Sequence, residues 1–273
     1  MVKIGSKTIT HIYQGSNLIT DDNSNTKDIK LGNKPVNFVY QGDELLYPNP
    51  VKDGLVLWYD FKGMKNSNVS KSIAKDISNN NNNGTINNVV YNDSSGYSLK
   101  GLKFDGVDDF IEVKHPSLLN NIKDEITISI TLEFSDNTGS WRWLLSNNSD
   151  ASASGGYGIA FNPSSSSALS FRWGNQVLYS RYIPQKGDIV CLHFSGSVLQ
   201  KTLNIYNNGS KTDTTTLTGT PKDTENNLFI GKSAYNNSET LNAFIKSVKV
   251  YNRCLSDQEI QHNYQLEKER WNL

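Results

Sequence analysis

The sequence predicts an all-β protein in which two antiparallel sheets pack face to face, followed by a short helix near the C-terminus. Two observations support this fold class. Short segments of alternating apolar and polar residues recur between turn residues, and no long helical period appears before residue 256. With 273 residues, the chain is long enough for one large β-sandwich and a small additional module.

The first fifty residues contain an internal repeat. Two segments, residues 3–9 (KIGSKTI) and 12–15 (IYQG), recur as residues 30–36 (KLGNKPV) and 39–42 (VYQG). Each copy is typical of two or three short strands joined by glycine turns, with a hairpin at the tyrosine-glutamine-glycine segment. A single copy has too few apolar side chains to be stable alone, so we expect the two copies to pack together or on a partner.

A proline-rich segment separates this repeat from the rest of the chain. Pro48 and Pro50 flank Asn49, and two prolines this close together stiffen and extend the backbone. We therefore expect two domains: a duplicated β module over residues 1–50, and a sandwich with its C-terminal helix over residues 51–273.

The strands of the sandwich are predicted from residue alternation. The clearest strand covers residues 126–134, where isoleucine, leucine and phenylalanine alternate with threonine, serine and glutamate. Residues 189–194 and 203–206 predict two more strands. The second of these ends at Asn207-Asn208-Gly209, a hairpin turn because asparagine-glycine readily takes positive φ.

The last predicted strand has apolar residues on both faces. Phe244, Val248 and Val250 share one parity, and Ile245 and Tyr251 share the other. We therefore expect both faces of this strand to be covered.

A capped helix follows that strand. Ser256 and Glu259 have the spacing of a capping box, in which each side chain bonds the backbone amide of the other residue. Ile260, Tyr264 and Trp271 fall near one face of the helix, and we expect this face to cover an edge of the sandwich.

Three ordered motifs resemble the pattern of a known fold. They are residues 54–61 (GLVLWYDF), residues 102–113 (LKFDGVDDFIEV) and the strand-helix segment at residues 244–260. Together they resemble a laminin-G-like, concanavalin A-like jelly-roll domain. The resemblance implies a two-sheet antiparallel jelly-roll sandwich, a fold that carries lectins, adhesion modules and glycan-cleaving enzymes.

Charge and hydropathy argue against several function classes. Lysine plus arginine and aspartate plus glutamate number 27 each, so no net field attracts nucleic acid or an anionic membrane. The sequence contains no apolar run of about 18 residues for membrane insertion, and its first residues lack the hydrophobic core of a signal peptide. We therefore expect synthesis in a cytoplasm, with Cys191 and Cys254 as reduced, buried thiols.

Two aromatic segments are candidate carbohydrate-binding sites. Aromatic faces stack on the apolar faces of sugar rings, and arginine supplies a planar fork of donors. The candidate residues are Trp141, Arg142, Trp143, Arg172, Trp173, Asn175 and Arg181. The competing interpretation is that some of these aromatic rings pack in the core or pair across strands.

Metal and catalytic residues are less well indicated. Asp105, Asp108 and Asp109 are candidate calcium ligands, because carboxylates on a tight loop suit a hard cation. The competing interpretation is a turn in which aspartates bond their own backbone. The four histidines lack zinc-motif spacing. Glycosidases need two paired carboxylates, and no such pattern is recognisable in the sequence, so we expect no catalytic residues and no enzymatic activity. We also expect no cofactor, although calcium binding stays open.

The N-terminal repeat resembles short modules that begin tail, baseplate and fibre proteins of bacteriophages of Gram-positive hosts. This resemblance implies a virion protein, made in the host cytoplasm, in which residues 1–50 contact other virion proteins. The sandwich then binds a host cell-wall polysaccharide, such as a decorated teichoic acid, during adsorption. We expect a homo-oligomer or many copies in the particle, because weak sites gain by avidity.

Two alternatives to this function stay open. In the first, the protein is a purely structural decoration or assembly protein of the virion. In the second, it is a cell-wall glycan hydrolase whose carboxylates come from distant strands.

Overall fold

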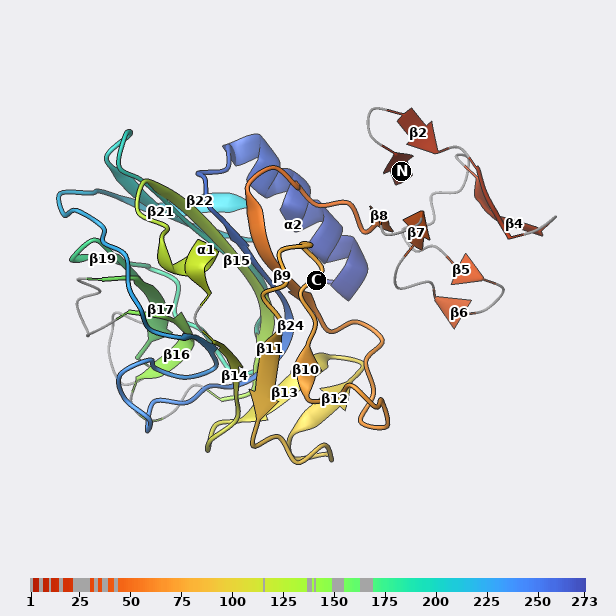
Figure 1. Cartoon of the computed structure of the whole chain (residues 1–273), viewed down its shortest axis with the longest axis horizontal. Helices are drawn as coiled ribbons and strands as arrows, with labels where there is room; N and C mark the ends of the chain where they lie inside the picture. Colours follow the sequence, from red (N-terminus) through yellow and green to blue (C-terminus); the bar gives the residue numbers. More distant parts are fainter. Residues whose placement is uncertain are drawn as a thin grey trace.

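The structure, a computed structural model, describes residues 48–114, 116–136, 139, 141–148, 155–162 and 169–273. For residues 2–47 it describes the backbone of eight short strands. Most helices and strands are labelled in Figure 1.

The N-terminal repeat forms four antiparallel hairpins, two from each copy. The pairs are β1 (Val2–Ile4) with β2 (Lys7–Ile9), β3 (His11–Gln14) with β4 (Asn17–Asp21), β5 (Lys30–Leu31) with β6 (Lys34–Pro35), and β7 (Val39–Gln41) with β8 (Glu44–Tyr47). Equivalent segments of the two copies therefore pair in the same way. Each copy contains four short strands rather than the two or three predicted, and the pairing of β3 with β4 agrees with the hairpin predicted at the tyrosine-glutamine-glycine segment. The division into two domains at residue 50 stays a prediction.

The rest of the described chain forms two antiparallel sheets of eight strands that pack face to face (Figure 1). We call the first the front sheet. Its order is β10 (Ile73–Ala74), β11 (Gly84–Asn87), β14 (Phe110–Val113), β23 (Leu228–Ile230), β16 (Arg142–Ser146), β17 (Tyr157–Phe161), β18 (Leu169–Trp173) and β19 (Gln176–Tyr179).

The second sheet, the back sheet, carries the C-terminal helix on its outer face (Figure 1). Its order is β12 (Gly96–Ser98), β13 (Gly101–Asp105), β24 (Asn242–Tyr251), β15 (Glu125–Phe134), β20 (Ile189–Ser197), β21 (Thr202–Asn207) and β22 (Ser210–Thr216), and β9 (Leu55–Asp60) also pairs with β24. The helices are α1 (Ser117–Asn120) and α2 (Asp257–Trp271). The predicted all-β sandwich with a C-terminal helix is therefore confirmed.

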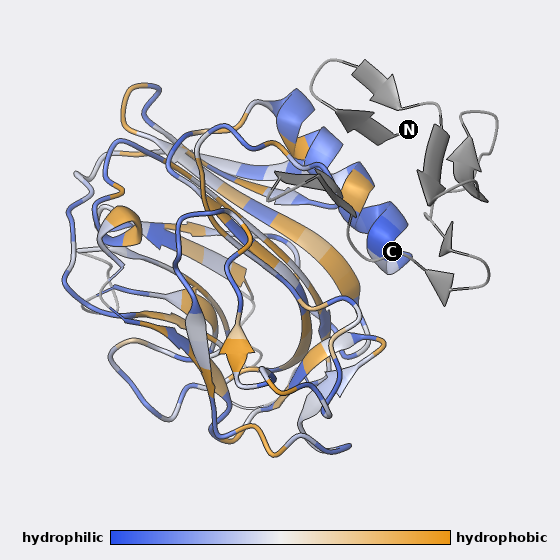
Figure 2. Ribbon diagram, turned by 45° about the vertical axis from the view of Figure 1, so that its right-hand side comes forward, coloured by the Kyte–Doolittle hydropathy of each residue, from blue (hydrophilic) through white to orange (hydrophobic). Residues whose placement is uncertain are grey.

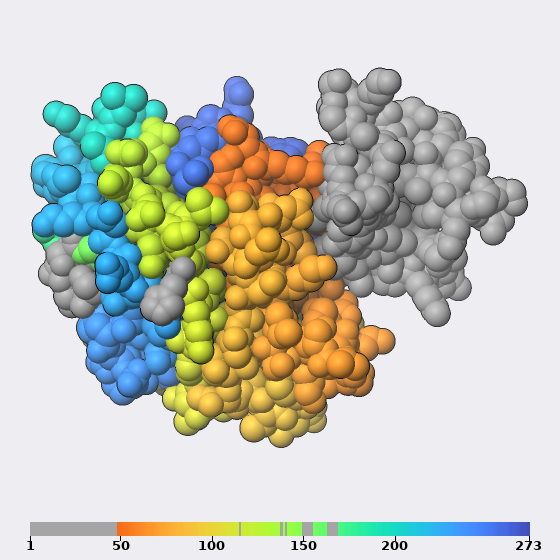
Figure 3. All heavy atoms as spheres, viewed as in Figure 1, coloured from red at the N-terminus to blue at the C-terminus, as the bar shows by residue number. Residues whose placement is uncertain are grey.

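The hydrophobic core lies between the two sheets, as the orange inner faces in Figure 2 show. The alternation predicted for residues 126–134 is correct: Ile126 to Phe134 contribute every second side chain to the core. The turn at Asn208 and Gly209 takes positive φ at both residues, also as predicted. Segments that are distant in the sequence also meet at the surface. The side-chain amide of Asn226 donates to the backbone carbonyl of Asn147. In Figure 3, the light-blue surface from later in the chain borders the yellow-green surface from earlier in the chain.

Both faces of the last strand are covered, as expected, because residues 245–251 are all buried, but the grouping of its residues by parity was wrong. Ile245, Val248 and Val250 all lie in the core. The reason is a β-bulge: Thr131 pairs with Ser247 but Leu132 pairs with Ile245, which leaves Lys246 as an extra residue on β24. A bulge reverses the alternation beyond it, so residues of opposite parity share one face.

Helix α2 begins with the predicted capping box. The Ser256 hydroxyl accepts from the Glu259 amide at 3.3 Å, and the Glu259 carboxylate accepts from the Ser256 amide at 2.9 Å. The buried face differs from the prediction, because Tyr264 is only partly buried. The buried residues of α2 are Ile260, Asn263, Glu267, Arg270 and Trp271.

A buried polar layer lies between α2 and the back sheet. Lys249 and Glu267 form an ion pair whose side chains are 2% and 3% exposed. Burial would raise the pKa of Glu267, but the ammonium of Lys249 outweighs burial and holds that pKa below its ordinary value. Burial lowers the pKa of His193 to about 3 and raises that of Cys191 to about 12, so both groups are neutral near pH 7. Within the described residues, no helix is long and apolar enough to cross a membrane.

Candidate functional site

The outer face of the front sheet, which points away from the back sheet, gathers part of the predicted site. Trp173 packs in the core, so its neighbour Arg172 on β18 points outward. Arg172 pairs directly with Gly158 of β17, and Trp143 of β16 pairs with Ala160 of β17. Gly158 and Ala160 are two residues apart on β17, so they lie on the same face of the sheet. Paired residues share a face, so Trp143 and Arg172 lie together on the outer face.

The ring of Trp143 lies close against β17. A Cβ added to Gly158 would lie 2.4 Å from Cζ3 of Trp143, so the absence of a side chain at Gly158 leaves the room that the ring occupies. Nε1 of Trp143 donates to the Glu239 carboxylate at 2.6 Å. The rings of Trp143 and Tyr235 lie nearly perpendicular, with ring centres 5.6 Å apart. Trp143 is only 1% exposed. Its part in the site is therefore to hold its neighbours in place.

Arg172 joins the two tryptophans. Its guanidinium carbon lies 4.6 Å from the ring centre of Trp141 and 5.3 Å from that of Trp143, within the range of cation–π attraction. Arg172 is 6% exposed, whereas Trp141 is only partly buried. One face of the Trp141 ring is thus occupied by Arg172, and the ring retains accessible surface for a ligand.

The loop between β23 and β24 adds two residues that sequence analysis missed. Tyr235 is 41% exposed and packs on Trp143, while Glu239 accepts the indole hydrogen bond. Ser146 of β16 fixes this loop to the sheet, because its hydroxyl accepts from the Ala234 amide at 2.7 Å and donates to the Lys232 carbonyl at 3.2 Å. We call Trp141, Arg172, Trp143 and Tyr235 the aromatic stack.

The remaining predicted residues lie outside the aromatic stack. Trp173 is fully buried in the core, so we remove it from the candidate site. Arg142 pairs with Phe161, a core residue, and so falls on the opposite parity from Trp143. Asn175 has a positive φ of 61° in the turn that follows Gly174. Arg181 forms a 3.0 Å ion pair with Asp213 at the sheet edge.

A second group of aromatic side chains lies on the same outer face. Phe110 of β14 and Phe229 of β23 meet edge to face with ring centres 5.8 Å apart. Nζ of Lys232 lies 4.5 Å from the first ring centre and 4.7 Å from the second, and donates to the Asn237 amide oxygen at 2.8 Å. Partial burial lowers the pKa of Lys232, although the nearby carboxylate of Glu112 raises it.

The three aspartates proposed as calcium ligands lie in the turn between β13 and β14. Their carboxylate oxygens come within 4.8 Å of one another. Asp109 accepts from the Asp105 amide at 2.9 Å, and Asp105 accepts from the Val107 amide at 2.8 Å. Burial raises the pKa of Asp109 to about 6, while the hydrogen bond from the Asp105 amide lowers it. These bonds favour the interpretation as a turn capped by aspartates.

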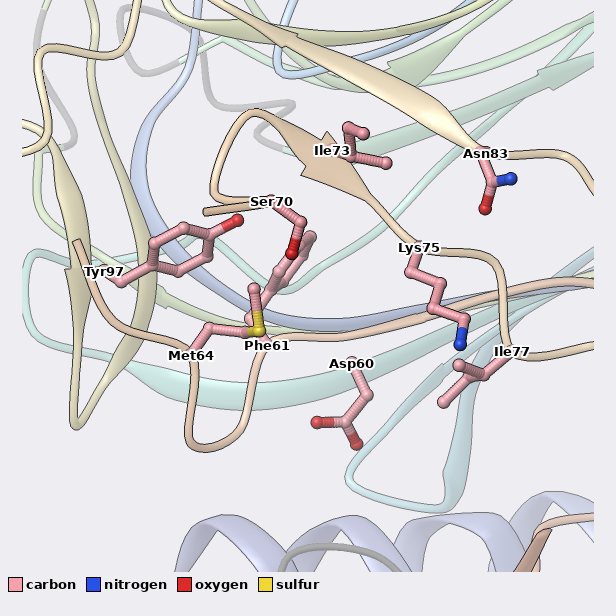
Figure 4. A pocket seen from close by; sticks show the side chains of 9 residues that line it. All are labelled: Asp60, Phe61, Met64, Ser70, Ile73, Lys75, Ile77, Asn83 and Tyr97. Carbon is pink, nitrogen blue, oxygen red and sulfur yellow. The ribbon is translucent and has the colours of Figure 1, made fainter. Parts of the chain in front are cut away.

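A cavity of about 380 Å³ opens near β10, at the opposite edge of the front sheet from β19. Figure 4 shows Tyr97 and Met64 on one side of the cavity and Lys75 and Ile77 on the other. Among the described residues that line it, Asp60 carries the single carboxylate, which accepts from Arg270 at 2.6 Å and 3.0 Å. A paired carboxylate, as glycoside hydrolysis requires, is not present among these lining residues.

Comparison with known proteins agrees with this architecture. Residues 105–261 match a family model described as the concanavalin A-like lectin/glucanases superfamily. No curated protein matches the sequence.

Two solved structures illustrate the likeness in fold. The sialidase of Trypanosoma rangeli, in complex with 2,3-difluorosialic acid, has a TM-score of 0.57 and 14% identity over 79% of this chain and 33% of the sialidase. The chain thus spans about a third of the length of that enzyme. Domain 4 of AbnA, a GH43 extracellular arabinanase from Geobacillus stearothermophilus, in complex with arabinotriose, has a TM-score of 0.54 and 14% identity over 77% of this chain and 98% of that domain.

Proposed function

Because the chain belongs to the concanavalin A-like lectin/glucanases superfamily, we propose that its sandwich is a non-catalytic domain that binds a carbohydrate on the outer face of the front sheet. The observation that carries this proposal is the aromatic stack. Two accessible rings, Trp141 and Tyr235, lie beside a buried tryptophan and a buried arginine that hold them in place.

The chemistry of the aromatic stack suits a sugar. The C–H faces of a sugar ring are apolar and pack on aromatic faces, while its hydroxyls need fixed donors and acceptors. Glu239 supplies an acceptor beside Tyr235, and the Trp143 indole fixes its position. A rigid surface loses little side-chain entropy when a ligand binds. A polar ligand that makes only weak contacts can therefore still bind.

The solved relatives support a binding role without catalysis. Domain 4 of AbnA is a separate domain of a larger arabinanase and was solved with arabinotriose, and the chain covers nearly all of that domain. The T. rangeli sialidase, by contrast, is about three times longer than the region it shares with this chain. We therefore propose that the protein is no enzyme and needs no cofactor.

The biological setting is part of the same proposal. We propose that the protein belongs to a bacteriophage virion, where residues 1–50 bind other virion proteins and the sandwich binds host cell-wall polysaccharide during adsorption. The duplicated hairpins support this arrangement, since two small β units gain stability when they pack on a partner surface. Several copies in the particle would convert weak single-site binding into stable attachment.

The proposal is tested by sedimenting the full-length protein with purified walls of Gram-positive cells. Trp141→Ala and Tyr235→Ala should each weaken binding about fivefold to tenfold, because each removes roughly 1 kcal/mol of ring contact. Arg181→Ala is the matched control, since Arg181 is exposed and pairs with Asp213 away from the aromatic stack. Equal binding by all three variants and the unchanged protein contradicts the proposal. Release of reducing ends from the walls would instead identify a hydrolase.

A further inference from the structure

The outer face of the front sheet carries a second group with the same chemical composition as the aromatic stack. Phe110 and Phe229 present aromatic surface, Lys232 supplies a donor and Glu112 an acceptor. Phe110 and Phe229 are partly buried, so part of each ring remains accessible. The amide of Asn227 donates to Glu112 at 2.8 Å and fixes that carboxylate, as Trp143 fixes Glu239.

The two groups are parts of one surface. Phe229 pairs across the sheet with Ser146 of β16, the same strand that carries Trp143. The loop that contains Lys232 and Tyr235 contacts both groups: Lys232 lies over the phenylalanines, and Tyr235 packs on Trp143. The two hydrogen bonds of Ser146 hold this loop on the sheet between them.

The spacing of the two groups sets the size of the ligand. Ser146 is opposite Phe229, and Trp141 precedes Ser146 by five residues. At about 3.4 Å per residue along a strand and about 4.8 Å between strands, Phe229 and Trp141 lie roughly 15 to 18 Å apart. A single sugar ring cannot contact both Phe229 and Trp141, whereas a chain of three or more rings can.

From this geometry we propose that Phe110, Phe229 and Lys232 form a second subsite, so that the outer face binds an extended oligosaccharide chain rather than a terminal sugar. Each subsite combines one cationic side chain with one carboxylate, Lys232 with Glu112 and Arg172 with Glu239. The positive and negative charges of these four side chains are equal in number, so the ligand class is a neutral polysaccharide chain rather than an anionic teichoic acid. This inference rests on the proposed function of the aromatic stack.

The test uses the full-length protein and glycan arrays that carry neutral and anionic chains of increasing length. Lys232→Met removes the cation but keeps an apolar side chain over the phenylalanines, and Phe229→Leu is a second variant that keeps the face apolar. For the neutral glycan that binds best, we expect affinity to rise about tenfold from disaccharide to longer chains. Both variants should remove most of this gain. Raising NaCl from about 0.1 M to about 0.5 M should change affinity less than about twofold.

The outcomes separate this inference from the proposed function. If Trp141→Ala weakens binding as predicted while Lys232→Met and Phe229→Leu keep the dependence on chain length, the second subsite is refuted and the aromatic stack stands. A preference for anionic chains with strong salt dependence refutes the neutral ligand class. If no carbohydrate binds the unchanged protein, both the proposed function and the second subsite are refuted.

Discussion

Replacing Gly158 with alanine should weaken carbohydrate binding although Gly158 itself is buried beside the Trp143 ring. Its new Cβ would lie 2.4 Å from Cζ3 of Trp143, whereas carbon atoms in contact normally lie about 3.5 to 4.0 Å apart. The ring must therefore move by about 1 Å. That movement disturbs the bond to Glu239 and the contacts with Arg172 and Tyr235.

We expect Gly158→Ala to reduce affinity for cell walls about five- to thirtyfold, equivalent to about 1 to 2 kcal/mol. The stability cost should be about 1 to 3 kcal/mol, as for other overpacked sites. Gly196→Ala is the matched control: its Cβ would lie 2.5 Å from the ring of Trp173, which is in the core. It should cost similar stability and leave affinity unchanged.

The assay combines thermal unfolding with wall sedimentation, carried out at a temperature where both variants are folded. If Gly158→Ala binds as tightly as the unchanged protein, Trp143 does not position the site. If Gly196→Ala weakens binding to the same degree, the effect reflects general stability rather than the outer face.

Three further predictions concern charge. Lys249→Met should lower the free energy of unfolding, measured in urea, by about 3 to 5 kcal/mol, because it leaves the Glu267 charge buried without its partner. Adding Glu267→Gln should recover most of this loss. If the double variant recovers no stability, the ion pair does not have this role. The pKa of Asp109 is raised on folding, so its stabilising contribution is present below about pH 4 and is lost as pH rises through about 6. Asp109→Asn should therefore stabilise the protein by up to about 3 kcal/mol at pH 7 and by little at pH 4, and the reverse pH trend in urea unfolding would refute this assignment. Chelation with EDTA should leave wall binding unchanged, because in our proposal the sugar is bound by side chains alone. A loss of binding that calcium restores would show that the calcium interpretation is correct.

The fold was predictable because the sheets separate apolar from polar residues with a period of two. The strand at residues 126–134 shows this alternation without interruption, and its apolar set is the set found in the core. The last strand was less predictable. A single bulge at Lys246 exchanges the faces, and no local feature of the sequence marks it.

The buried face of α2 was also hard to predict, because that face is partly polar. Glu267 and Arg270 are buried, each paired with a charge from the sheet, Lys249 or Asp60. Sequence patterns identify apolar faces, whereas the partner of a buried charge lies far away in the chain.

The candidate site was predictable in part. Trp141, Trp143 and Arg172 were selected for their chemistry, and the structure brings them together. Trp173 is adjacent to Arg172, and only the pairing of β17 with β18 shows which of the two points outward. Tyr235 was missed because a loop delivers it to β16 from about 90 residues away in the sequence.

The most direct measurement is a crystal structure of the full-length protein with the oligosaccharide that binds best on the array. We predict that one sugar ring packs on Trp141 and Tyr235 within hydrogen-bonding distance of Glu239, and that the chain continues toward Lys232. A ligand bound in the cavity near Asp60, or on the loops of the back sheet, would contradict the assignment of the outer face as the binding surface.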